Sequence, residues 1–174
     1  MGMRIEVADG NSARTVIQNL FVTYMRELSD TACLNVREDG TFALAPSLAT
    51  YWDGTAGRHP FLIRADGKLA GFALIRRLTA ATFAHDMGEF FVLRKYRRTG
   101  VGRDAACGLF DRFPGNWEVR ELPANTPAQA LWRKIIGDYT AGDFGDALEY
   151  FQAYQREFVV QRFRSGGANS RLSA

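Results

Sequence analysis

The spacing of apolar side chains predicts that strands and helices alternate along the chain. Residues 3–8 alternate between apolar and polar side chains, which is typical of a half-buried strand. Residues 13–28 follow a turn and predict an amphipathic helix, because apolar side chains recur at every fourth position and share one face. The positions in this stripe are Val16, Leu20, Tyr24 and Leu28. Residues 30–58 contain several turn-forming Gly and Pro residues and predict loops with a short helix or two.

The middle of the chain predicts a hairpin, a strand and a helix. Two apolar runs, residues 60–64 and 69–77, are joined by an Asp-Gly turn, which is a strong β-hairpin signal. The second run is nearly all apolar, as expected of a central strand that is covered on both faces. Residues 89–93 predict the next strand. After a basic turn the period changes, and residues 101–113 predict a helix with one apolar stripe.

The last third of the chain adds further elements. Residues 117–122 alternate like a strand, and Thr126 is the predicted N-cap of a helix that begins at Pro127. The aromatic run 149–163 predicts one final strand. Residues 165–174 are small and polar, and they predict a disordered tail.

The composition fits a single folded domain. The chain has 174 residues, of which 47% are apolar and 13 are Phe, so it can bury a substantial core. We therefore expect residues 1–164 to form one mixed α/β domain. Cys33 and Cys107 cannot form a metal site alone and indicate a reduced, intracellular protein. No apolar run approaches the length of a membrane span and no secretory pattern begins the chain, so we expect a cytoplasmic location without membrane or metal partners.

Positive charge gathers at one place in the sequence. The formal net charge is +3, from 22 basic and 19 acidic residues. A cluster of basic residues lies just before and within the predicted helix 101–113: Arg94, Lys95, Arg97, Arg98 and Arg103. This cluster favours a local phosphate site over a general polyanion surface. Nucleic-acid binding is the weaker interpretation, because the cluster lacks the interleaved aromatic residues of a single-strand platform.

The glycine loop Gly100-Val101-Gly102 lies between the predicted strand 89–93 and the predicted helix. Loop amides and the positive end of the helix dipole point at the same place, so this arrangement forms an anion site. Glycines let the backbone approach a ligand closely. The spacing matches neither the dinucleotide-binding fingerprint nor a Walker P-loop. A glycine turn without a ligand is the structural alternative.

The segment Arg97-Arg98-Thr99-Gly100-Val101-Gly102 resembles the Arg/Gln-x-x-Gly-x-Gly/Ala motif of the GNAT superfamily, the acyl-CoA-dependent N-acetyltransferases. The order of predicted elements is also similar to that family. In addition, Asn125-Thr126-Pro127-Ala128 looks like the family's Asn-x-x-Ala segment. The resemblance implies a single domain with a central, mostly antiparallel twisted sheet flanked by helices. It also implies acetyl-CoA as the co-substrate.

The resemblance implies where acetyl-CoA would bind. The backbone of Phe91, Val92 and Leu93 would pair with the pantetheine arm like an extra strand, and Asn125 would contact the arm near its thiol end. The acyl group would lie where the motif strand and the strand 117–122 splay apart. The loop amides and side chains would hold the pyrophosphate, and the residues in this part are Arg97, Arg98, Thr99, Gly100, Val101, Gly102 and Arg103.

The reaction needs a base, because an ammonium has no lone pair with which to attack a thioester. Glu89 is the first candidate, since a Glu often stands at this point of the motif strand in the family. Asp86 and His85 lie just upstream, where other members place a base. The alternative for Glu89 is a substrate-binding or merely paired carboxylate, and a water-relayed base also stays open.

Two alternatives stay open for the protonation of the leaving thiolate. Many family members use a Tyr in the helix after the Asn segment, but Trp132 occupies that place. An indole N–H donates a hydrogen bond but is not a useful acid. Either another group such as Tyr139 serves, or the thiolate, with a pKa of about 8.5 like that of free cysteine, leaves without a dedicated acid.

The sequence thus predicts an N-acetyltransferase that acts on a primary amine of a small molecule or peptide. A different class of function is an acyl-CoA-binding regulatory module without catalysis, which the missing Tyr supports. The sequence identifies neither the acceptor nor the oligomeric state, and a homodimer is left open.

Overall fold

The computed structural model describes residues 2–32, 35–42, 48–78 and 85–166. Their strands are β1 (Met3–Val7), β2 (Arg58–Ala65), β3 (Lys68–Arg77), β4 (His85–Val92), β5 (Gly115–Glu121), β6 (Phe144–Phe151) and β7 (Arg156–Ser165). Their helices are α1 (Asn11–Ala32), α2 (Val101–Arg112) and α3 (Thr126–Thr140), with short 3-10 helices η1 (Leu48–Tyr51) and η2 (Arg94–Tyr96).

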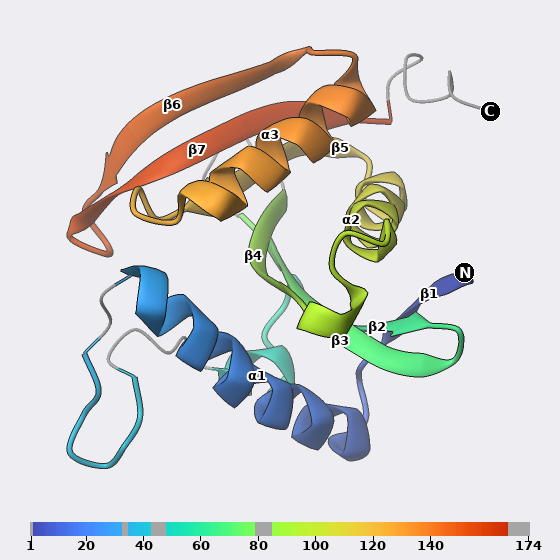
Figure 1. The fold of residues 1–174 in the computed structure, drawn as a ribbon, viewed down its shortest axis with the longest axis vertical. Helices are drawn as coiled ribbons and strands as arrows, with labels where there is room; N and C mark the ends of the chain where they lie inside the picture. The colour runs from blue at the N-terminus through green and yellow to red at the C-terminus, as the bar shows by residue number, and fades with distance from the viewer. Residues whose placement is uncertain (1, 33–34, 43–47, 79–84, 167–174) are drawn as a thin grey trace.

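All of these strands join one twisted sheet, in the order β1-β2-β3-β4-β5-β7-β6 (Figure 1). Neighbouring strands run antiparallel, except for β4 and β5, which run parallel. The predicted mixed α/β fold with a mostly antiparallel sheet is therefore confirmed. The β2–β3 hairpin turns at Asp66-Gly67, and both residues have the positive φ that such a turn requires.

Helices cover the two faces of the sheet separately. Figure 1 shows α1 on one side of β4 and α2 and α3 on the other. Side chains alternate along each strand, so neighbouring residues of β2 and β3 enter opposite cores. The core under α1 includes Leu62, Phe72 and Leu74, whereas the core under α2 and α3 includes Phe61, Ala73 and Ile75. The predicted stripe of α1 packs against the first core through Val16, Leu20, Tyr24 and Leu28.

The predicted final strand over residues 149–163 is wrong. The chain instead forms a hairpin of β6 and β7, with a turn at residues 152–155. This turn contains no Gly or Pro, which is why the sequence pattern did not indicate it. Gln155 adopts a left-handed φ of 49°, and its N–H donates to the Gln152 carbonyl. Ser165 ends β7 and is buried, so it does not belong to a tail. Most of the predicted tail, residues 167–174, lies outside the described residues.

Two other boundaries differ from the prediction. β4 begins at His85, four residues earlier than predicted, because a buried charge at Asp86 interrupts the apolar pattern. The N-cap of α3 is Asn125, whose Oδ1 accepts from the Ala128 N–H at 3.3 Å. Asn is at least as good an N-cap as Thr, so Asn125 takes the place predicted for Thr126.

Candidate active site

The glycine loop opens α2 in the conformation that an anion site needs. Gly100 is the N-cap and has a φ of 92°, a left-handed value that favours glycine. The first intrahelical bond runs from the Asp104 N–H to the Gly100 carbonyl, at 3.0 Å. The N–H groups of the first helical turn before Asp104 therefore donate no hydrogen bond within the helix. Arg98 and Arg103 are exposed beside them, so charge and amides lie at the same end of the helix.

Two side chains of this loop, those of Arg97 and Thr99, bind other parts of the protein. The Arg97 guanidinium donates from Nε to the Val92 carbonyl at 2.7 Å and lies 2.6 Å from Glu27 in an ion pair. It thereby connects the loop to β4 and α1. The Thr99 hydroxyl donates to the Tyr96 carbonyl at 2.7 Å. These contacts stabilise the loop. All four polar side chains expected at the pyrophosphate are exposed, but only Arg98 and Arg103 make no hydrogen bond or ion pair within the described residues that would compete with a ligand.

Strands β4 and β5 separate after a short parallel pairing. Only His85 with Trp117 and Asp86 with Glu118 are paired, although both strands continue beyond these residues. The separation leaves one edge of β4 unpaired. The backbone of Val92 faces this edge, because the Leu93 N–H donates to Ala70 on the β3 side, at 2.8 Å, and the sides alternate along a strand. Of the three residues expected to pair with pantetheine, Val92 therefore offers its backbone N–H at this edge, while its carbonyl already accepts from Arg97.

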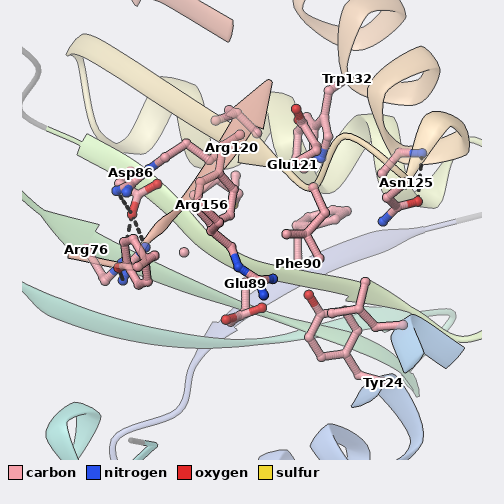
Figure 2. A pocket seen from close by; sticks show the side chains of 18 of the residues that line it. Tyr24, Arg76, Asp86, Glu89, Phe90, Arg120, Glu121, Asn125, Trp132 and Arg156 are labelled. Carbon is pink, nitrogen blue, oxygen red and sulfur yellow. Dashed lines mark hydrogen bonds and ion pairs between the residues drawn. The ribbon is translucent and has the colours of Figure 1, made fainter. Parts of the chain in front are cut away.

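A cavity of about 430 Å³ lies at the point of separation. Its walls come from α1, β3, β4, β5, α3 and the β6–β7 hairpin (Figure 2). The residues labelled in the figure are Tyr24, Arg76, Asp86, Glu89, Phe90, Arg120, Glu121, Asn125, Trp132 and Arg156. Segments that are far apart in the sequence thus meet around one partly open space, whose volume suits a small ligand.

Glu89 lines this cavity because of a β-bulge. The register of β3 and β4 passes from Leu74–Glu89 to Ile75–Met87, so Gly88 is the extra residue. Met87 packs in the core under α2 and α3. In a regular strand residues two apart share a face, so without the bulge Glu89 would lie on the same face as Met87, and the bulge moves it to the face of α1.

The environment of Glu89 suits proton transfer near neutral pH. Burial raises the pKa of its carboxyl from 4.5 to about 7, while the hydroxyl of Tyr24 and the charge of Arg76 act in the opposite direction. Tyr24 reaches this carboxyl from α1, and the pKa of Tyr24 is raised well above 10, chiefly by burial and then by the charge of Glu89. A general base works best with a pKa near the working pH. The Glu89 carboxylate has that property.

Asp86, the second predicted base, is held by two arginines. Its side chain is fully buried, and its Oδ2 accepts from Arg76 Nε at 2.7 Å and from Arg120 Nη2 at 3.0 Å. Arg120 also forms an ion pair with Glu118 at 3.0 Å, and Glu118 forms another with Arg162 at 2.7 Å. The result is a row of alternating charges that crosses the sheet where β4 and β5 are still paired. This geometry favours a structural role for Asp86.

A family model describes this combination of elements. The model for the acetyltransferase (GNAT) family matches residues 22–137, which include α1 from Val22 onward, the glycine loop and most of α3. The chain belongs to the GNAT family. The resemblance that the motif Arg97–Gly102 suggested is therefore confirmed, and the domain is that of an acetyltransferase.

Solved GNAT structures have the same fold. An acetyltransferase from Streptococcus agalactiae is 14% identical, with a TM-score of 0.65, and the match covers 96% of this chain and 98% of that one. A Bacillus subtilis acetyltransferase, solved in complex with CoA, is 13% identical, with a TM-score of 0.57 and coverage of 94% and 99%. The Escherichia coli ribosomal-protein-S18-alanine N-acetyltransferase is 17% identical, with a TM-score of 0.55 and coverage of 99% and 100%. No curated protein sequence matches the chain.

Tyr139, the candidate acid named from the sequence, lies outside the cavity. The Tyr139 hydroxyl donates to Asp111 Oδ1 at 2.7 Å, and Tyr139 does not line the cavity. Trp132 does line it, and its ring packs edge-on against Phe90 with centroids 5.1 Å apart. Asn125 lines the cavity as well, and its Nδ2 remains available because only Oδ1 is used for capping. Trp132 and Asn125 are therefore the hydrogen-bond donors near the place of the family's Tyr.

Sequence reasoning missed Glu121, a third carboxyl in this cavity besides Asp86 and Glu89. Burial raises its pKa from 4.5 to about 8, the charge of Asp146 adds to this effect, and Arg133 opposes it. In the amide orientation that satisfies both side chains, Gln161 donates to Glu121 Oε1 at 2.8 Å. A signal was present in the sequence. Glu121 follows Trp117 and Val119 at a period of two, so it is a carboxyl on the apolar side of its strand.

No group of His, Cys, Asp or Glu side chains in the described part of the chain has the arrangement of a metal site. No helix there is both long enough and apolar enough to cross a membrane.

Proposed function

We propose that the protein transfers an acetyl group from acetyl-CoA to a primary amine, with Glu89 as the base. The observation that carries the proposal is the cavity at the separation of β4 and β5, which contains a carboxyl with a pKa of about 7. The GNAT membership and the anion site at α2 support the choice of acetyl-CoA. Solved neighbours include one that holds CoA and one named for acetylating an alanine of a ribosomal protein.

The residues present fit coenzyme A. The first-turn amides of α2, with Arg98 and Arg103, would hold the pyrophosphate. A Cβ at Gly102 would approach Val92 and Phe90 no closer than 3.7 Å, so packing does not require glycine there. The absent side chain instead leaves the amides open to a ligand. The unpaired edge of β4 at Val92 would accept the pantetheine arm, and Asn125 Nδ2 would contact the arm near its thiol.

The chemistry then follows from the cavity residues. Glu89 accepts one proton from the acceptor ammonium and exposes the nitrogen lone pair. The nitrogen attacks the thioester carbonyl, the new C–N bond forms, and the C–S bond breaks with its electrons on sulfur. The second proton from nitrogen ends on the thiolate, while Glu89 returns the first to solvent. Trp132 or Asn125 would donate a hydrogen bond to the sulfur. No dedicated acid is required, because the pKa of the leaving thiol, about 8.5, is low.

The test is a stoichiometric assay over a panel of primary amines that includes amino acids, peptides, polyamines and aminoglycosides. Thiol release from acetyl-CoA and acetylated amine, measured by mass spectrometry, should appear in equal amounts. Calorimetric titration with acetyl-CoA in the same buffer checks binding independently. Tight binding without amine-dependent release would indicate a regulatory module that lacks catalysis. Absence of binding would overturn the proposal entirely.

A further inference from the structure

One cation in the cavity has no counter-charge. Arg156 begins β7 and lines the cavity, and Figure 2 shows its guanidinium among the labelled side chains there. Its Nε is buried and has no hydrogen-bond partner. The guanidinium also makes no ion pair with any residue in the described ranges. A buried donor without a partner costs on the order of 1–3 kcal/mol, and more for a charged group, so this cost points to a ligand.

The other two arginines of the cavity differ because both form ion pairs, although the Nε of Arg120, like that of Arg156, makes no hydrogen bond. Arg76 is paired with Asp86, and its Nη1 also donates to the Tyr154 hydroxyl at 3.2 Å. Arg120 is paired with Asp86 and with Glu118. Both guanidinium groups therefore have structural partners from the sheet itself. Arg156 alone, among the cavity arginines, is available to a ligand.

The charge balance of the cavity favours an anionic group. Asp86 and Glu118 together offset the charges of Arg76 and Arg120. The remaining carboxyls, Glu89 and Glu121, have pKa values raised to about 7 and about 8 by burial, so much of their population is neutral near pH 7. Arg156 therefore leaves the cavity with excess positive charge on a half-buried side chain. A ligand anion would offset that charge.

The Arg156 wall of the cavity belongs to the β6–β7 hairpin. Tyr154 and Phe158, from the same hairpin, line the cavity together with the α1 residues Met25 and Leu28. Arg156 and Phe158 are two residues apart on β7, so they share one face of the strand. The expected pantetheine contacts, Val92 and the glycine loop, belong to other elements. The cavity thus joins a carboxyl that can take a proton, a free guanidinium and an apolar wall.

We propose that the acceptor is a small amine that also carries a carboxylate, such as an amino acid or a short peptide, and that Arg156 binds this carboxylate while Glu89 faces the amine. This inference rests on the proposed function, because it takes the cavity as the acceptor site. A guanidinium binds a carboxylate through two parallel hydrogen bonds. One unpaired arginine matches the single charge of a carboxylate.

The experiment compares amines that share a side chain and differ in the carboxylate, with each kcat/KM expressed per unprotonated amine. Phenylalanine, phenylalaninamide and 2-phenylethylamine share a side chain that suits the apolar wall. We expect the wild-type kcat/KM for phenylalanine to exceed that for either amine without a carboxylate by about 10-fold to 100-fold. This ratio corresponds to the contribution of one hydrogen bond between charged groups. Arg156→Gln should reduce this ratio towards one, and Arg156→Lys should restore part of it. The KM for acetyl-CoA should change little.

The matched control is Arg164→Gln, on the same strand but exposed and outside the cavity. It should leave the ratio unchanged. A wild-type enzyme that prefers the neutral amines would overturn the inference. So would an Arg156→Gln variant that loses activity equally for all three amines, because that result indicates a structural role.

A binding measurement separates this inference from the proposed function. Calorimetry compares N-acetylphenylalanine with its amide on the wild type and on Arg156→Gln, and it needs no turnover. A preference for the carboxylate that Arg156→Gln abolishes, together with no acetyl transfer to any amine, would overturn the proposed function and leave the inference standing. Acetyl transfer to an amine without any preference for the carboxylate in binding would overturn this inference and leave the proposed function standing.

Discussion

Replacing Asp86 by Asn tests whether this residue holds the sheet together or takes part in proton transfer. The change keeps the shape of the side chain but removes its charge. In the structure, Asp86 Oδ2 accepts from Arg76 and Arg120, and the carboxylate side chain is 1% exposed. Arg120 is only 11% exposed. The Asp86→Asn variant would therefore leave two arginines, one of them deeply buried, without a shared counter-charge.

The expected loss of stability is large. Removal of one partner from a buried ion pair costs about 3–5 kcal/mol. Arg76 is 23% exposed and Arg120 retains Glu118, so the lower end of this range applies. With an m-value of about 2 kcal/mol per M urea, a loss of about 3 kcal/mol lowers the unfolding midpoint by about 1.5 M.

Urea unfolding followed by tryptophan fluorescence measures this shift, and kcat/KM is measured on the same samples at low temperature. Asp138→Asn serves as the control, because Asp138 forms an exposed pair with Lys134 at 3.3 Å on the surface of α3. That variant should change the free energy of unfolding by less than about 0.5 kcal/mol. If Asp86→Asn kept its midpoint but lost the pH dependence of kcat/KM, the structural assignment would be refuted and Asp86 would be the base.

Three further variants test other parts of the account. Glu121→Gln should flatten the pH dependence of stability: the folded pKa, about 8, exceeds the ordinary 4.5, so the wild type loses stability as pH rises between these values. Above pH 8 the wild type loses at most about 4–5 kcal/mol of its free energy of unfolding through this group. Denaturant midpoints that change equally between pH 5 and pH 9 in both proteins would contradict this. Gly100→Ala should weaken acetyl-CoA binding by calorimetry and destabilise the fold by about 1–2 kcal/mol, because φ is 92° there; unchanged affinity would argue against the anion site. Tyr139→Phe should keep kcat within about twofold, because the hydroxyl binds Asp111 and not the cavity, whereas a large loss would restore Tyr139 as the acid.

Local patterns predicted the elements whose signals are local. The Asp-Gly turn predicted the β2–β3 hairpin, and the four-residue spacing from Val16 to Leu28 predicted α1. The glycine loop predicted the N-terminus of α2, where Gly100 is the N-cap. In each case the physical cause, a turn conformation or one apolar face, lies within a few neighbouring residues.

The cavity could not be predicted in the same way, because its walls come from residues as distant as Tyr24 and Phe158. Asp86 interrupts the apolar pattern of β4 and is buried only because Arg76 and Arg120 reach it from neighbouring strands. The β6–β7 turn is formed without Gly or Pro, so Arg156 was hidden inside one predicted strand. The position of Glu89 depends on the bulge at Gly88, which only the register with β3 reveals.

The pH dependence of kcat/KM in the wild type and in Glu89→Gln tests the central claim most directly. The wild-type value should rise as pH increases through about 7, because the carboxyl of Glu89, whose pKa burial raises to about 7, must lose its proton to act as the base. Titration of the acceptor amine is common to both proteins, so the difference between the profiles isolates Glu89. We predict that Glu89→Gln lacks this limb and loses about 10²-fold to 10⁴-fold in kcat/KM. A variant with the wild-type profile and rate would show that Glu89 is not the base.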